Sequence, residues 1–229
     1  MCSASPSVTG RSEPDLAGQT VVLIGGSAGI GLETAKCSRA HGANVILTGR
    51  NPDRLIEAAR DVEARQTAAF DATDDTALKS FFENLSTPVD HVMVGHVTLY
   101  LAVARHSAGK MTPHGSLIFM GGTGGRRVTK DLGIVPAATA ALPPFTAALA
   151  LELAPIRVNL IAAGFVDTPL SAALLGERLD ERRAELRAKL PIGRVVGPAD
   201  VAALAVHLMT NTALTGATYD IDGGQQFVQ

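Results

Sequence analysis

Tryptophan is absent from this 229-residue sequence, and tyrosine and cysteine occur only twice each. The two cysteines, Cys2 and Cys37, form no CxxC pair, which argues against a zinc site and for a reducing compartment. An excess of either charge is also lacking, because 20 Lys and Arg residues stand against 22 Asp and Glu residues. The resulting net charge of −2 offers no basic surface to nucleic acid or to an anionic membrane.

Long hydrophobic runs are missing as well. No apolar run reaches the roughly 20 residues needed to cross a bilayer, and the first residues contain no hydrophobic segment of the signal-peptide kind. We therefore expect a cytoplasmic protein with no membrane or nucleic-acid partner. Residues 1–16 are rich in Ser, Pro and charge, which predicts a disordered leader before a single domain over residues 17–229.

Short aliphatic runs alternate with amphipathic stretches along the rest of the chain, and 46% of all residues are hydrophobic. The strand-like runs cover residues 20–24, 44–48, 67–70, 91–94, 116–120, 156–161 and 217–221. This alternation predicts α/β architecture, a single Rossmann-type doubly wound parallel sheet of about seven strands with helices on both faces. The ligand of such a fold lies at the carboxyl ends of the strands.

A glycine-rich turn, Gly25-Gly26-Ser27-Ala28-Gly29-Ile30-Gly31, follows the first strand-like run. Glycines suit a turn in which the backbone bends sharply, approaches a pyrophosphate closely and packs a helix start against the strand. The same letters also fit the G-x-S-x-G elbow of hydrolases, with Ser27 as nucleophile. That alternative is disfavoured for two reasons. The turn follows the first strand, and no histidine follows an acidic residue in an arrangement that would complete a Ser-acid-His triad. The turn therefore predicts a dinucleotide site.

Arg50 follows the second strand-like run, at the position where dinucleotide folds contact the adenosine ribose. A carboxylate there accepts from a free 2′-hydroxyl, whereas a guanidinium pairs with a 2′-phosphate. The acid is missing, because position 49 is glycine. The pattern predicts NADP(H) rather than NAD(H), and the alternative is a solvated arginine that opens the next helix.

With these features in place, the chain resembles the short-chain dehydrogenase/reductase family over nearly all of residues 17–227. The matching stretches are IGGSAGIG (24–31), LTGRN (47–51), FDATD (70–74), LALELAPIRVNLIAAGFVDTP (149–169), GRVVGPADVAALAVHLM (193–209) and LTGATYDIDGG (214–224). The resemblance implies hydride transfer between nicotinamide and a carbonyl or alcohol. It places the adenine at Asp71 and Ala72. The complete predicted cofactor set is Gly25, Ser27, Gly29, Ile30, Gly31, Arg50, Asn51, Asp71, Ala72, Ala163, Gly164, Val166 and Thr168.

The family's catalytic residues are absent from the matching positions. The family uses a Tyr that exchanges a proton with the substrate oxygen, a Lys four residues later that lowers the phenol's pKa, and a Ser that holds the carbonyl. The resemblance places these at Val135, Thr139 and Gly122, and no tyrosine in the chain is followed by a lysine four residues later. It therefore implies NADP(H) binding without the usual proton-transfer groups.

The connection between the fourth and fifth strand-like runs is shorter than the family's. Residues 95–115 leave room for one helix where the family has two, so one helix and one wall of the cleft are expected to be missing. Pro143 and Pro144 fall within the helix that carries Tyr and Lys in the family. Because proline removes a backbone donor, this helix is expected to kink or split.

Three functions are left open: an NADP(H)-dependent oxidoreductase of the short-chain type that lacks the usual Ser, Tyr and Lys, a non-catalytic NADP(H)-binding protein such as a redox sensor or partner subunit, and an inactive deletion variant. Groups that could replace the lost chemistry, although each more often has a structural or solvated role, are Thr123, Tyr100, His96, Lys130 and Asp131. No metal site is expected, because no shared helical face joins the histidines at 91, 96, 106 and 114.

Residues 97–110 and 136–153 are apolar with few charges, and the family pairs the matching helices between subunits. We therefore expect a homodimer or homotetramer.

Overall fold

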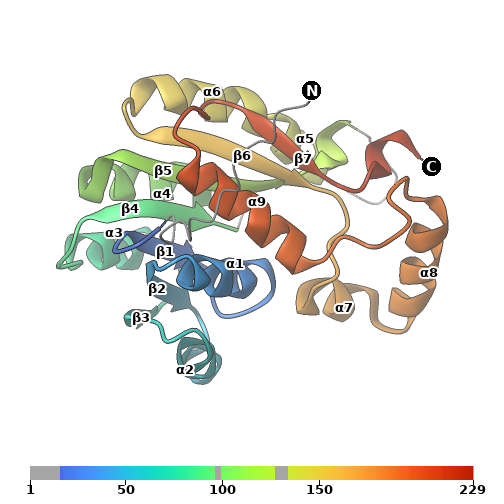
Figure 1. Cartoon of the computed structure of the whole chain (residues 1–229), viewed down its shortest axis with the longest axis horizontal. Coiled ribbons are helices and arrows are strands. Elements are labelled where there is room, and N and C mark those ends of the chain that lie inside the picture. The colour runs from blue at the N-terminus through green and yellow to red at the C-terminus, as the bar shows by residue number, and fades with distance from the viewer. Residues whose placement is uncertain (1–15, 96–98, 127–133, 229) are drawn as a thin grey trace, which may run out of the picture.

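The structure is a computed structural model that describes residues 16–95, 99–126 and 134–228. Strands and helices alternate along the chain (Figure 1). The strands are β1 Thr20–Ile24, β2 Asn44–Gly49, β3 Gln66–Ala69, β4 Val89–Val94, β5 Met111–Gly122, β6 Arg157–Ala163 and β7 Thr218–Ile221. The helices are α1 Gly29–Ala40, α2 Pro52–Asp61, α3 Asp75–Glu83, α4 Tyr100–Ser107, α5 Val135–Ala140, α6 Leu142–Glu152, α7 Pro169–Leu175, α8 Leu179–Lys189 and α9 Pro198–Thr210. Short 3₁₀ turns are η2 Ala108–Lys110, η3 Thr123–Arg126, η4 Gly176–Arg178 and η5 Gln225–Phe227.

The seven strands form one parallel sheet in the order β3-β2-β1-β4-β5-β6-β7, which confirms the predicted architecture. The strand order reverses between β1 and β4. In open α/β sheets such a switch point opens a crevice at the carboxyl ends of the two strands, and ligands bind there. Ile24 marks this edge, because it pairs with Thr48 of β2 on one side and with Val94 of β4 on the other.

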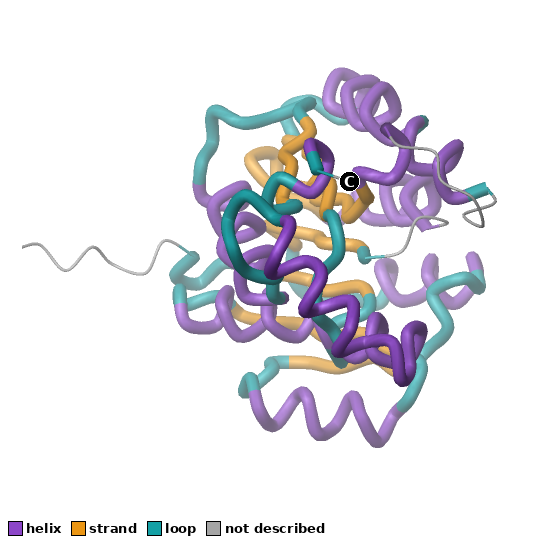
Figure 2. Tube along the Cα trace, turned by 90° about the vertical axis from the view of Figure 1, so that its right-hand side faces the viewer, coloured by secondary structure: helices purple, strands orange, loops and turns teal. Residues whose placement is uncertain are grey.

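Apolar residues cover both faces of the sheet. Leu23 belongs to the core cluster beneath α1 and α9, whereas its neighbour Val22 belongs to the cluster beneath α3, α4 and α6. Successive strand residues point to opposite faces, so the central strands must be apolar throughout. The end-on view in Figure 2 shows the strands between the two helical layers, and α1 and α9 pack against each other on one of them.

The shortened connection and the split helix have the predicted form. Within the described part of residues 95–115, α4 is the one α-helix, and η2 follows it directly. The helix expected to kink is divided at Ala141 into α5 and α6. Pro143 and Pro144 lie in the first turn of α6, where the missing N–H groups have no helical partner in any case.

The structure differs most from the sequence expectation at β5, at α7 and at the end of the leader. β5 begins at Met111 rather than at residue 116, and α7 was not predicted at all. Leu16, which the sequence places in the leader, is fully buried, and its N–H donates to the His41 carbonyl over 3.0 Å. The rest of the predicted leader, residues 1–15, lies outside the described residues. In the part of the chain that the structure describes, no helix is long and apolar enough to span a membrane.

Candidate cofactor site

A cavity of about 220 Å³ opens at the carboxyl ends of β1, β4 and β5. Its lining combines strand ends, the glycine turn and the start of α7: Leu23, Ile24, Gly25, Ala28, Gly29, Ile30, Gly31, Met93, Gly95, Met120, Thr168, Pro169 and Leu170. Five predicted cofactor residues are therefore brought together here, from segments more than 130 positions apart. Sequence reasoning missed Met93, Met120 and Leu170, because their role depends on which strand ends become neighbours.

The glycine turn has a geometry that side chains would prevent. Gly25 and Gly29 have φ values of 90° and 54°, in the region that only glycine adopts without strain. A Cβ on Gly31 would lie 2.5 Å from the carbonyl oxygen of Gly25, so the helix can start this close to the turn only without one. The Gly26 N–H donates to the Thr48 carbonyl over 2.9 Å and anchors the turn to β2.

The N-terminus of α1 faces this cavity, and no side chain accepts a hydrogen bond from the backbone N–H groups of its first turn. Its N-cap residue is Ala28, and no side chain caps the first turn. The first N–H groups of a helix lack intrahelical partners and carry the positive end of the helix dipole. This cradle of glycines and open N–H groups fits the pyrophosphate of a dinucleotide.

The loop after β2 holds the residues predicted to contact the adenosine ribose. Arg50 is exposed and makes no ion pair with any residue in the described ranges. Asn51 is the N-cap of α2, where its Oδ1 accepts the Arg54 N–H over 2.9 Å. Asn51 therefore has a structural role that the sequence comparison did not suggest.

Asp71 and Ala72 follow β3 at the same edge of the sheet. The Phe70 N–H donates to the Gly49 carbonyl over 3.1 Å, which ties the end of β3 to the end of β2. Asp71 is exposed, and its Oδ1 accepts from the N–H and hydroxyl of Thr73 at 3.0 and 2.8 Å. Both residues are thus near the loop that carries Arg50, outside the lining of the cavity.

The segment after β6 borders the other end of the cavity. Ala163 and Val166 are buried, and a Cβ on Gly164 would lie 2.7 Å from both Asp222 Cβ and Gln225 Oε1. Thr168 caps α7 through a reciprocal pair with Ser171, whose N–H donates to Thr168 Oγ1 over 3.2 Å. This T-P-x-S capping pattern is the signal from which α7 could have been predicted.

Gly122, Val135 and Thr139, where the sequence resemblance places the family's proton-transfer residues, lie near the end of β5. A Cβ on Gly122 would be 3.8 Å from Thr139 Cγ2. The Thr139 hydroxyl donates to the Val135 carbonyl over 2.9 Å, within its own helix, and Val135 is about half exposed. A cavity of about 150 Å³ lies here, lined by Gly122, Gly125, Arg126, Thr139, Ala140, Pro143, Leu160, Ala162 and Thr218.

Tyr100, one of the predicted replacement groups, is buried and hydrogen-bonded to the backbone. Its ring is buried against Phe119, and its hydroxyl donates to the Met120 carbonyl. Burial raises the pKa of Tyr100 well above its ordinary value of 10. Thr123 lies in η3, while His96, Lys130 and Asp131 lie outside the described residues. Among the residues described, no group of three or more His, Cys, Asp or Glu side chains is placed to hold a metal ion.

An ion pair that the sequence did not reveal holds Arg126, one of the residues that line the second cavity. Arg126 in η3 forms a bidentate pair with Asp220 of β7, with 2.7 Å between Arg126 Nη2 and Asp220 Oδ1. Arg126 also donates to Gln226 Oε1 over 2.8 Å. The Arg126 guanidinium holds the pKa of Asp220 below its ordinary value. Because 94 residues separate the partners, no local pattern in the sequence could have paired them.

Comparison with known proteins identifies the family. Residues 19–94 match the family described as short chain dehydrogenase, and residues 88–226 match the family described as enoyl-(acyl carrier protein) reductase. The second match alone spans more than half of the chain. The protein therefore belongs to the short-chain dehydrogenase/reductase family.

Individual relatives agree with this assignment. The short-chain dehydrogenase/reductase ATR9 of Stachybotrys chlorohalonatus is 29% identical over 252 aligned positions, which cover 92% of this chain and 98% of ATR9. The alignment is longer than the 229-residue chain, so ATR9 contains segments that this chain lacks.

Two solved structures share the fold. The MalC reductase/Diels-Alderase of Malbranchea aurantiaca has a TM-score of 0.88 at 23% identity, covering 95% of this chain and 100% of MalC. BdcA in complex with NADPH has a TM-score of 0.79 at 22% identity, covering 92% of this chain and 95% of BdcA.

Proposed function

We propose that this short-chain dehydrogenase/reductase binds NADP(H) in the cavity at the switch point. The observation that carries the proposal is the uncapped N-terminus of α1 within the glycine cradle, with the exposed Arg50 at the end of the neighbouring strand. A guanidinium without a carboxylate partner suits the 2′-phosphate of NADP(H). The NADPH complex of BdcA, which has the same fold, supports this choice of cofactor.

Each part of the site has a role toward the dinucleotide. The first-turn N–H groups of α1 bind the pyrophosphate, Arg50 binds the 2′-phosphate, and Asp71 with Ala72 borders the adenine. The segment from Ala163 to Thr168 holds the nicotinamide end, where the apolar side chains of the cavity exclude water. When bound, the nicotinamide supplies hydride to a carbonyl carbon or accepts it from an alcohol.

Proton transfer is the step that this chain's residues do not support. Gly122 has no side chain, Val135 cannot ionise, and the Thr139 hydroxyl is already hydrogen-bonded to its own helix. A positioned general acid typically contributes 10²- to 10⁴-fold to the rate. We therefore infer that turnover of ordinary ketones and aldehydes is undetectable or very slow. The same three residues favour the second function, a non-catalytic NADP(H)-binding protein.

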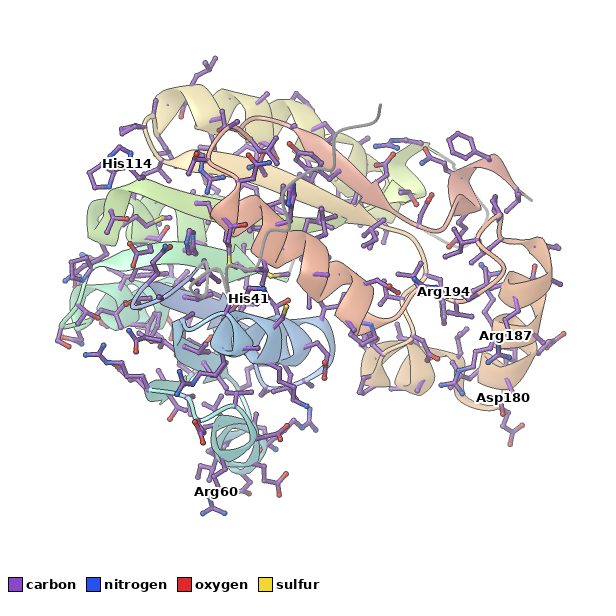
Figure 3. The ribbon with its side chains drawn as sticks, viewed as in Figure 1. His41, Arg60, His114, Asp180, Arg187 and Arg194 are labelled. Carbon is purple, nitrogen blue, oxygen red and sulfur yellow. The ribbon has the colours of Figure 1, made fainter. Side chains whose placement is uncertain are left out.

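Calorimetric titration with NADPH and NADH tests the cofactor assignment. NADPH is expected to bind roughly 10- to 100-fold more tightly, because a bidentate charge-assisted contact contributes about 1.5–3 kcal/mol. The substitution Arg50→Ala should abolish this preference. Arg60→Ala is the matched control, because Arg60 lies in the last turn of α2 and points into solvent (Figure 3). Equal affinities for the two cofactors in the unmodified protein would refute the assignment.

We also propose that the chain forms a homodimer or homotetramer through α4 and α6. Leu151 on α6 is 82% exposed and Leu101 on α4 is 65% exposed. Glu152 is the one charged residue of α6. A helix such as α6, with exposed apolar side chains and one charge, is typical of a subunit interface.

A further inference from the structure

The segment that leads from β6 into α7 is held by α8, a helix that contributes no residue to the cavity lining described above. Thr168 lines the cavity, whereas its neighbour Asp167 does not. The backbone at Thr168 is extended, with φ −132° and ψ 165°, so the side chains of Asp167 and Thr168 point to opposite sides. The Asp167 carboxylate therefore points away from the cofactor site, and there it meets Arg183 of α8.

Arg183 holds Asp167 through two hydrogen bonds at once. Its Nε donates to Asp167 Oδ2 over 2.9 Å, and its Nη2 donates to Asp167 Oδ1 over 2.8 Å. Its Nη1 donates to Asp180 Oδ1 over 2.9 Å, one turn earlier on α8. A planar guanidinium that is fixed by a residue of its own helix is pre-organised for this two-point contact. The side chains of Arg183 and Asp167 are 29% and 30% exposed, so solvent screens the pair only in part.

The helix that follows Asp167 has little hydrophobic attachment to the core. None of the seven residues of α7 is buried, and Leu170 and Leu174 are 69% and 73% exposed. Figure 1 shows α7 and α8 side by side at the right-hand end of the molecule. Because α7 gains little from apolar burial, its position depends on the polar contacts at its start.

The start of α7 is also where two sides of the cofactor cavity meet. A Cβ on Gly29, in the glycine turn, would lie 3.6 Å from Thr168 Cβ. The Asp167 N–H donates to the Val196 carbonyl over 3.0 Å, which fixes the backbone on one side of the segment, and Arg183 fixes the side chain on the other. A segment held from both sides need not be ordered when a ligand binds, so less free energy is lost on binding.

We propose that Arg183 is a positioning residue for the cofactor. By holding Asp167, it fixes Thr168 and the start of α7 in the place from which they contact the nicotinamide end. Arg183 itself touches no part of the cavity, so it acts only through the segment that it holds. This role rests on the NADP(H) function proposed above.

Calorimetric titration with NADPH and with adenosine 2′,5′-bisphosphate tests the role. The bisphosphate carries the adenosine half of the cofactor and lacks the nicotinamide. Arg183→Met is expected to weaken NADPH binding about three- to fivefold, the effect of a well-formed and partly exposed ion pair, and to leave the affinity for the bisphosphate unchanged. Arg182→Met is the matched control, because Arg182 pairs with Glu185 within α8, with 2.6 Å between Nη1 and Oε2. Equal weakening of both ligands, or unchanged NADPH binding, would overturn the proposal.

A double-mutant cycle assigns the effect to the pair. Asp167→Ala should weaken NADPH binding to a similar extent, and the double variant Asp167→Ala/Arg183→Met should bind no more weakly than either single variant, because both changes remove the same contact. Losses that multiply in the double variant would show two independent effects and refute the role of the pair.

Hydrogen exchange in the absence of cofactor separates this inference from the function on which it rests. The amides of α7 should exchange about three- to fivefold faster in Arg183→Met than in the unmodified protein, while those of α2 should be unchanged. If the unmodified protein does not bind NADPH, the proposed function fails. Faster exchange in α7 would then still support the hold of Arg183 on this segment, and unchanged exchange would refute it.

Discussion

His91 makes the stability of this protein depend on pH. It lies in β4 with only 3% of its surface exposed, 2.8 Å from Ser116 Oγ at Nδ1 and 2.6 Å from Gln19 Oε1 at Nε2. A neutral ring satisfies both contacts when Nε2–H donates to Gln19 and Nδ1 accepts from the Ser116 hydroxyl. Burial lowers the pKa of His91 from 6.5 to about 4; the Arg157 charge acts in the same direction, and the neighbouring Asp90 opposes it.

The sign and size of the effect follow from this shift. Because the native state favours neutral His91, its contribution is fully present above pH 6.5 and is lost as the pH falls toward 4. Between pH 7 and pH 5 this loss amounts to about 2 kcal/mol of the free energy of unfolding. Carboxylates whose pKa values are lowered by ion pairs, such as Asp75, lose their contribution only near and below pH 4. The loss of stability caused by His91 and the loss caused by the carboxylates therefore occur in different pH ranges.

Urea denaturation at fixed ionic strength, at half-unit steps from pH 7 to pH 4.5, measures this slope. The His91→Asn variant cannot take up the proton and should lose less than 0.5 kcal/mol over the same interval, whatever its stability at pH 7; that bound is about a quarter of the loss expected for His91. His114→Gln is the control, because His114 is exposed at the edge of the molecule (Figure 3) and should keep the full slope. A slope of about 2 kcal/mol that persists in His91→Asn would refute the assignment to this ring.

Three further predictions concern chemistry, assembly and the core. In assays that follow NADPH absorbance against a panel of carbonyls, the triple variant Gly122→Ser, Val135→Tyr, Thr139→Lys should exceed the unmodified protein by about 10²- to 10⁴-fold, while each single change should not. Light scattering should show an oligomer that Leu151→Glu converts to a monomer, because Leu151 is 82% exposed on α6; a monomeric unmodified protein would contradict this. Buried Arg157 donates to the carbonyls of residues 208, 209 and 214 at 2.7, 2.7 and 3.1 Å. Arg157→Met should therefore cost about 3 kcal/mol in urea denaturation, and a loss below 1 kcal/mol would be inconsistent with this role.

The fold could be predicted because its signals are local and repeated. Aliphatic runs separated by amphipathic stretches define the alternation, and a parallel sheet with helices on both faces is the arrangement that buries such runs. Boundaries were less predictable where tertiary contacts decide them. β5 extends back to Met111 because its first residue pairs with Val89 across an irregularity in the ladder. Leu16 is buried because its backbone reaches the turn after α1, which a polar flanking sequence does not reveal.

The candidate site also has one part that could be predicted from the sequence and one part that could not. The glycine turn was predictable, since its residues are contiguous and each of its glycines is needed for a positive φ or for a close backbone approach. The partners that complete the cavity come from β4, β5 and α7 and become neighbours only after folding. The Arg126–Asp220 pair also lies beyond any sequence pattern, because it joins a 3₁₀ turn to the last strand.

Tyr100 shows why residue type alone cannot assign chemistry. Because the resemblance places no tyrosine at the family's catalytic position, the sequence made Tyr100 a candidate acid. β4 ends at Val94, which pairs with Phe119, so Met120 is the first residue of β5 beyond the ladder with β4. The Tyr100 hydroxyl donates to the Met120 carbonyl from the short α4 connection, and the ring packs on Phe119. A buried donor committed to a backbone carbonyl cannot also exchange a proton with substrate. In this chain α4 ties its tyrosine to the end of β5, so Tyr100 is not placed to act as the replacement acid that the sequence allowed.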